Sequence, residues 1–113
     1  MKGICLSVFT AFLLVSCDNY QQIGQESPDR NKVESGQKFK IVLPENHTTG
    51  YMWQLKQDFE TKNIDYIKSV FHGNEKGVYY HFIAGDKGTA TLKFALIKYH
   101  DTTDVKTFII DIQ

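Results

Sequence analysis

A short polar segment, Asn46-His47-Thr48-Thr49-Gly50, has the residue types of a surface that recognises another protein. It follows Leu43-Pro44, where an apolar run ends, and it precedes the aromatic sequence Tyr51-Met52-Trp53. Gly50 can adopt a positive φ without steric cost, so the backbone can turn sharply there. A loop held between two strands can present its backbone to a partner, and the small threonines allow close approach and carry hydroxyls. Turn chemistry alone also fits a β-turn that merely joins two strands.

The residue types that usually carry catalysis lack a supporting arrangement. The four histidines have no ligand-like spacing and are His47, His72, His81 and His100. No Ser-His-Asp or Cys-His arrangement is supported, because the only cysteine expected in the mature chain is predicted to carry a lipid. We therefore predict that the chain is not an enzyme and needs no cofactor or metal, although residues distant in sequence can still converge on a metal.

The residues from Asn46 to Trp53 resemble the Asn-Pro-Thr-Thr-Gly-Tyr/Phe-x-Trp signature of the chagasin-like inhibitors of papain-type cysteine peptidases. The chain departs from this signature where His47 replaces the proline. Proline would fix φ and stiffen the loop, so histidine is expected to lose that restraint and to add a titratable ring. The resemblance runs from about Val33 to Gln113, and it implies an immunoglobulin-like sandwich that inhibits such peptidases reversibly and competitively.

The resemblance also implies three loops at one end of the sandwich that together fill the peptidase cleft. Loop 1 would contribute Asn46, His47, Thr48, Thr49, Gly50 and Tyr51, loop 2 would contribute Gly73, Asn74, Glu75, Lys76 and Gly77, and loop 3 would contribute Lys98, Tyr99 and His100. The middle of loop 2 either touches the peptidase or forms a plain hairpin loop. In loop 3, the family has Arg-Pro-Trp where this chain has Lys98-Tyr99-His100, so a charge and a ring remain but the large apolar anchor is lost. Tyr99 is either a substitute anchor or a core residue at a strand end.

By the same resemblance, Thr48-Thr49-Gly50 would lie against the catalytic cysteine of the peptidase. A rigid loop can occupy the cleft while holding its carbonyls out of attack geometry, and its rigidity limits the entropy lost on binding. Tyr51 and Trp53 are expected to pack and to support the loop. The altered loop 3 and the lost proline motivate an alternative, a non-inhibitory immunoglobulin-like surface or periplasmic lipoprotein that acts as a binding or assembly module.

The N-terminus has the features of a secretion signal. Lys2 is followed by an apolar stretch from Ile4 to Val15, which is too short to span a bilayer. It ends in Leu14-Val15-Ser16-Cys17, which resembles a bacterial lipobox, so residues 1–16 are predicted to be a lipoprotein signal peptide and Cys17 to carry the lipid. An ordinary signal peptide with an incidental cysteine is the alternative. The polar residues 17–32 are predicted to form a flexible tether. We therefore expect a lipid-anchored lipoprotein of the bacterial cell envelope, facing the periplasm or the cell surface.

Residues 33–113 suffice for one small domain. Apolar residues alternate in several short runs with turn signals between them, and no run has a sustained helical period. The predicted inward faces are Phe39, Ile41 and Leu43; Val78, Tyr80, Phe82 and Ala84; Ala90, Leu92, Phe94 and Leu96; and Phe108, Ile110 and Ile112. This pattern predicts an all-β protein, an immunoglobulin-like antiparallel β-sandwich. Acidic and basic residues balance, and no basic patch or charge block suggests binding to nucleic acid or a polybasic contact with a membrane. We expect a monomer.

Overall fold

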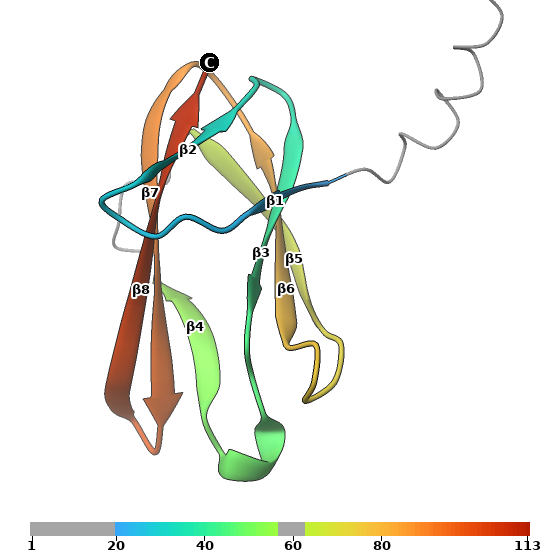
Figure 1. Cartoon of the computed structure of the whole chain (residues 1–113), viewed down its shortest axis with the longest axis vertical. Coiled ribbons are helices and arrows are strands. Elements are labelled where there is room, and N and C mark those ends of the chain that lie inside the picture. Colours follow the sequence, from blue (N-terminus) through green and yellow to red (C-terminus); the bar gives the residue numbers. More distant parts are fainter. Residues whose placement is uncertain (1–19, 57–62) are drawn as a thin grey trace, which may run out of the picture.

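The computed structural model describes residues 20–56 and 63–113, which form eight strands and one short 3₁₀ turn (Figure 1). The elements are β1 (Gln21–Ile23), β2 (Arg30–Val33), β3 (Lys38–Leu43), η2 (His47–Thr49), β4 (Met52–Lys56), β5 (Ile64–Phe71), β6 (Val78–Ala84), β7 (Gly88–Lys98) and β8 (Asp101–Ile112). The predicted signal peptide, residues 1–16, and the predicted lipidation site, Cys17, lie outside the described residues. Within the described part of the chain, no helix is long and apolar enough to cross a membrane.

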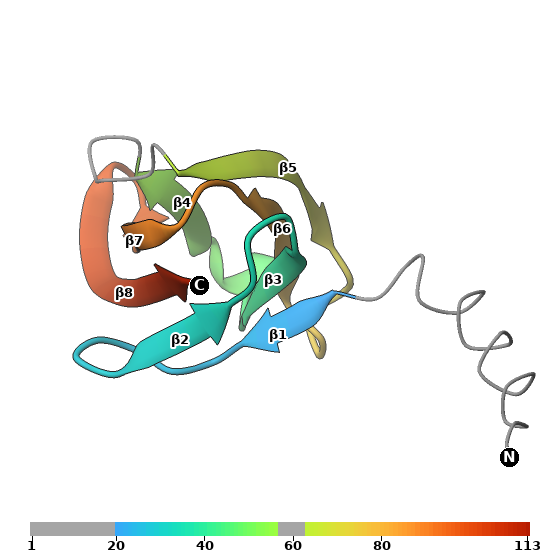
Figure 2. The same cartoon turned by 90° about the horizontal axis from the view of Figure 1, so that it is seen from above.

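The strands form two four-stranded sheets that pack face to face, as the view from above shows (Figure 2). The first sheet has the order β1-β3-β6-β5, and the second has the order β2-β8-β7-β4. The core between them contains the alternating apolar residues of β3, β6, β7 and β8, including Phe39, Phe82, Phe94 and Ile110, each at most 1% exposed. The prediction of an all-β, immunoglobulin-like sandwich is confirmed, and so are its inward faces, with Leu96 only partly buried.

Two parallel pairings modify the predicted antiparallel arrangement. β1 pairs with β3 in parallel, and β2 pairs with β8 in parallel, so both sheets are mixed. The other neighbouring strands are antiparallel. The sequence pattern could not predict this, because alternation identifies the buried face of a strand but not the direction of its neighbour.

The prediction of a flexible tether over residues 17–32 is wrong from β1 onward. Ile23 is 3% exposed, and Asn31, at 6% exposure, uses its side-chain amide to bond the backbone of Gln25 and the carbonyl oxygen of Ile109. These strands were missed because each buries few apolar side chains, and Asn31 fills an inward position with a polar group that finds its partners only in three dimensions. The domain therefore includes β1 and β2, which precede Val33 or end at it.

Candidate functional site

Three loops lie at the same end of the sandwich, as the resemblance implied (Figure 1). Loop 1 connects β3 in the first sheet to β4 in the second, so it crosses from one sheet to the other. Loop 2 connects β5 to β6 within the first sheet, and loop 3 connects β7 to β8 within the second. Loop 1 is therefore central, with one neighbour on each side. We call this surface the three-loop end.

The tip of loop 1 is ordered by its own hydrogen bonds. Asn46 caps η2, and its Oδ1 accepts from the backbone N–H of Thr48 at 3.0 Å and from the Thr48 hydroxyl at 2.6 Å. The Thr49 hydroxyl donates to the carbonyl oxygen of Asn46 at 2.8 Å. Both threonine hydroxyls thus donate inside the loop, where they fix its shape. Gly50 ends the turn with a φ of 84°, the left-handed conformation that glycine tolerates best.

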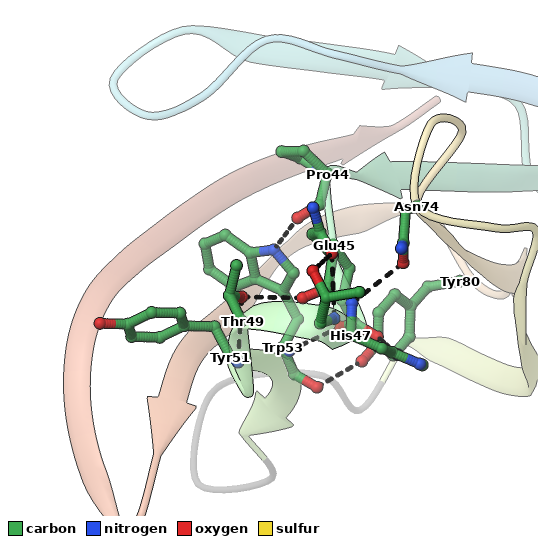
Figure 3. Close-up of polar contacts among 10 residues, drawn as sticks. Pro44, Glu45, His47, Thr49, Tyr51, Trp53, Asn74 and Tyr80 are labelled. Atoms are coloured by element: carbon green, nitrogen blue, oxygen red, sulfur yellow. Dashed lines mark hydrogen bonds and ion pairs between the residues drawn. The ribbon is translucent and has the colours of Figure 1, made fainter.

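The buried carboxylate of Glu45 supports this tip from the side that faces the sandwich (Figure 3). One of its oxygens accepts from the backbone N–H of Trp53 at 2.8 Å, and the other lies 2.5 Å from Nε2 of His47. Glu45 therefore ties the start of β4 to the start of η2, although it is only 7% exposed. Sequence patterns do not reveal this residue, since a single acidic residue between Pro44 and Asn46 gives no periodic or motif signal of burial.

His47 has three contacts that a proline at this position could not make. Its backbone N–H donates to Oδ1 of Asn74 in loop 2 at 3.0 Å, its ring bonds Glu45, and the same ring stacks on Phe71 with centroids 3.7 Å apart and 13° between the planes. The expected loss of restraint is therefore offset by other contacts. Proline would stiffen loop 1 through its own φ, whereas His47 fastens loop 1 to β5 and to loop 2.

The aromatic residues after loop 1 hold β4 to the rest of the sandwich. Trp53 is 6% exposed, and its Nε1 donates to the carbonyl oxygen of Pro44 at 2.7 Å, as expected for a packed residue of the signature. The Tyr80 hydroxyl donates to the carbonyl oxygen of Trp53 at 3.0 Å. Burial raises the pKa of Tyr80 well above its usual range, with further contributions from Glu45 and Tyr66, so this hydroxyl keeps its proton and remains a donor.

Loop 2 is a tight hairpin loop whose Asn74 reaches loop 1. The backbone N–H groups of Lys76 and Gly77 both donate to the carbonyl oxygen of Gly73. Gly77 has a φ of 85° and lies against Leu43, such that a Cβ there would collide with the carbonyl oxygen of Leu43. Glycine is therefore required at this position by both conformation and space. Glu75 and Lys76 are exposed at the tip of the loop.

Loop 3 is a two-residue turn between Lys98 and Asp101, which are register partners of β7 and β8. Tyr99 and His100 have φ values of 52° and 76°, the pattern of a type I′ turn, which usually contains Asn and Gly. Tyr99 is 82% exposed, so the alternative that it is a core residue at a strand end is wrong. Nζ of Lys98 lies 4.8 Å from the ring centroid of Tyr51 and 5.5 Å from that of Tyr99, and it therefore links loop 3 to loop 1.

Two surface hollows flank loop 1. The hollow between loops 1 and 2 has a volume of about 230 Å³ and is lined by Pro44, Glu45, Asn46, Thr49, Tyr51, Asn74 and Leu96. The hollow on the side of loop 3 has a volume of about 390 Å³ and is lined by Gly50, Met52, Trp53, Gln54, Ile97, Tyr99 and His100. Each could accept a side chain of a protein bound at the three-loop end. Among the described residues, no group of three or more His, Cys, Asp or Glu side chains is placed to hold a metal ion.

The fold and the three-loop end thus define a β-sandwich that presents a ridge of loops, and comparison with known proteins identifies its family. The family model described as chagasin family peptidase inhibitor I42 matches residues 32–112. The chain therefore belongs to the chagasin family of peptidase inhibitors, whose members are inhibitors and not enzymes.

One solved structure with the same fold is the cysteine protease inhibitor EhICP2 from Entamoeba histolytica. The two structures align with a TM-score of 0.67 and 15% sequence identity, over 84% of this chain and 94% of that one. At this identity the likeness concerns the fold. No curated protein is significantly similar to the chain in sequence.

Proposed function

We propose that this protein is a reversible, competitive inhibitor of papain-like cysteine peptidases and that loop 1 enters the active-site cleft. The observation that carries the proposal is the arrangement of the three-loop end. There, loop 1 lies between loops 2 and 3, and contacts of Glu45 and His47 hold its Thr48-Thr49-Gly50 tip in place. Such a tip loses little freedom when it binds, and it blocks the cleft without placing a carbonyl in line for attack.

The side loops would make secondary contacts. Exposed residues at their tips are available to a peptidase: Glu75 and Lys76 in loop 2, and Tyr99 and His100 in loop 3. Asn74 is engaged with loop 1 and would act mainly by holding the two loops together. Tyr99, which stands in place of the lost apolar anchor of the family, would be the main contact of loop 3, since exposed tyrosines are frequent interface anchors.

The test is inhibition of papain and of a cathepsin-L-like enzyme, measured with a chain that begins at Asp18 so that β1 and β2 are kept. Thr48→Trp should weaken inhibition at least tenfold, because a bulky side chain prevents close approach of the tip. Thr89→Trp is the matched control, since Thr89 is exposed near the start of β7, at the opposite end of that strand from loop 3. Absence of inhibition at micromolar concentration across several such enzymes would exclude this function and favour the non-inhibitory binding module.

We further propose that the protein is a monomeric lipoprotein held in the bacterial cell envelope by a lipid on Cys17. The sequence Leu14-Val15-Ser16-Cys17 at the end of the apolar stretch supports this. Labelling cells with a radioactive or clickable fatty acid should mark the wild-type chain but not Cys17→Ser, and the wild type should sediment with membranes. Equal labelling of the two chains would argue against the anchor. Analytical ultracentrifugation of the chain from Asp18 tests the monomer.

A further inference from the structure

Three lysines gather on the outer face of the first sheet, around a central histidine. Lys40 in β3 and Lys68 in β5 are the register partners of His81 on either side of β6, and Lys38 lies two residues before Lys40 on the same face. Lys38 and Lys68 are exposed. Lys38 and Lys40 are separated by the buried Phe39, and Lys68 is far from both in the sequence, so the three lysines form no charge block in the sequence. We call this surface, with Tyr20 and Tyr79, the basic face.

Aromatic rings lie between these charges. Nζ of Lys38 is 5.7 Å from the ring centroid of Tyr20, and Nζ of Lys40 is 5.1 Å from that of Tyr79. The ring of Tyr20 also packs edge-on against His81 at 4.7 Å. His81 is 9% exposed, and its buried Nδ1 has no hydrogen-bond partner among the described residues. An acidic side chain on the same face, Asp65, lies opposite Ile83 at the edge strand, so the positive charge predominates around His81.

The path of the chain places this face close to Cys17. Tyr20 packs on the basic face, and Cys17 precedes it by three residues, which span at most about 11 Å when fully extended. A lipid on Cys17 would therefore bring the membrane within that distance of Tyr20. β1 then runs parallel to β3, from the level of Phe39 to that of Ile41 and in the direction of loop 1. The three-loop end consequently lies at the far end of the sheet from the point where the chain enters.

From this convergence of charge and chain path we propose that the basic face docks on the anionic phospholipid headgroups of the membrane that holds the protein. Lysines near an anionic leaflet each favour binding by about fivefold, and tyrosines are suited to the headgroup region. The proposal goes beyond inhibition and uses residues outside the three loops. It relies on the proposed anchor for proximity, and on Lys38, Lys40 and Lys68 for the preference for anionic lipid.

The test is a lysine footprint of the lipidated full chain reconstituted in vesicles, read by mass spectrometry. In vesicles with about 30 mol% phosphatidylglycerol, modification of Lys38, Lys40 and Lys68 should be at least about threefold slower than in purely zwitterionic vesicles. Adding salt to about 0.5 M should remove this difference. Lys32, on the second sheet, and Lys87, in the turn before β7, are internal controls and should react alike in both. Equal reactivity of the basic-face lysines in the two kinds of vesicle would overturn the proposal, as would protection of Lys98 instead.

Two triple variants distinguish docking through a defined face from attraction by the net charge of the whole protein. Modification of the exposed His72, whose ring lies 4.1 Å from that of Tyr79, should be slowed by anionic vesicles in the wild type and in K32Q/K56Q/K87Q, but not in K38Q/K40Q/K68Q. Loss of protection in both variants would mean that net charge alone attracts the protein, and this would overturn a defined face. If labelling finds no lipid on Cys17, the same footprint of the full chain mixed with preformed vesicles still tests the face.

Discussion

The backbone N–H of His47 donates a 3.0 Å hydrogen bond to Oδ1 of Asn74, which lies 27 residues further along the chain. This bond joins loop 1, which connects the two sheets, to loop 2, which belongs to the first sheet. The two loops are therefore presented as one surface. A chain with the proline of the family signature at this position would lack the donor, whereas any other residue at position 47 would supply it.

A double-mutant cycle between these two residues should reveal the coupling. Asn46 has extended backbone angles, and residue 47 begins η2, so the backbone accepts proline in His47→Pro. In the wild type, Asn74→Ala should cost about 0.5–1 kcal/mol of unfolding free energy and should weaken peptidase inhibition severalfold. In the His47→Pro background the same substitution should cost nothing further. Equal costs in both backgrounds, measured by urea unfolding, would show that the bond does not couple the loops.

Glu45 should be far more sensitive to alanine than to glutamine. Glu45→Ala leaves the buried backbone N–H of Trp53 without an acceptor, at a cost of about 2–3 kcal/mol. For a domain of this size the melting temperature should fall by about 10 °C or more. Glu45→Gln keeps an oxygen for Trp53 and should lose less than half as much. Similar melting temperatures for the two variants would contradict the assigned role of the oxygen.

Gly50 and Gly77 share nearly the same φ, 84° and 85°, but differ in the space around them. A Cβ at Gly50 would lie 3.5 Å from Cε of Lys98, an ordinary contact, so Gly50→Ala should cost only the backbone strain, about 1–2 kcal/mol. Gly77→Ala adds a collision with the backbone of Leu43 and should cost more than about 3 kcal/mol. Chemical unfolding of both variants checks this order, and a reversed order would refute the packing argument.

In loop 3, the residues that favour peptidase binding are expected to differ from those that favour stability of the domain. Replacing Tyr99-His100 by Asn-Gly supplies the residues that a type I′ turn favours and should stabilise the domain by about 1 kcal/mol. The same change removes the exposed Tyr99 ring and should weaken peptidase inhibition about tenfold or more. Tyr66→Ala, at another exposed tyrosine (48%), should leave inhibition unchanged. Full inhibition by the Asn-Gly variant would remove Tyr99 from the interface.

Acid should destabilise the protein through His81. Burial lowers the pKa of His81 below its ordinary value of 6.5, with further contributions from Lys68, Lys40 and His72. The unfolded chain then binds a proton more readily than the folded one, so the contribution of His81 is complete above pH 6.5 and is lost as the pH falls below it. The other titratable groups near His81 are Tyr20 and Tyr79, whose rings pack near its own, and Lys38 and Asp65, which lie on the same face of the sheet.

Urea unfolding at pH 7.5 and at pH 5 checks the effect. The wild type should lose more free energy of unfolding between the two pH values than His81→Phe, which keeps a ring against Tyr20 but cannot bind a proton. An equal loss in the two proteins would assign the acid sensitivity to other groups.

Local patterns predicted most of the sandwich, because alternation along β3, β6, β7 and β8 reports directly which side chains are buried. The loops of the candidate site were also located, since glycine and polar residues mark them. The contacts that fasten the site were not predicted. Phe71 and Asn74 meet His47 only after β3, β5 and β6 assemble into one sheet, and Glu45 becomes buried only in the folded domain. No spacing in the sequence encodes these contacts. The grouping of Lys38, Lys40 and Lys68 was missed for the same reason.

The two short N-terminal strands affect whether copies of this protein can pair through the edges of their sheets. β1 lies beside β3 and β2 beside β8, and each occupies the outermost position of its sheet. Without them, the parts of β3 and β8 that they pair with, residues 39–41 and 109–112, would expose unpaired backbone donors and acceptors to a strand from a second molecule. Although β1 and β2 bury little apolar surface, they thus reduce the tendency to aggregate. A chain shortened to Lys32 would be prone to self-association even if its core still formed.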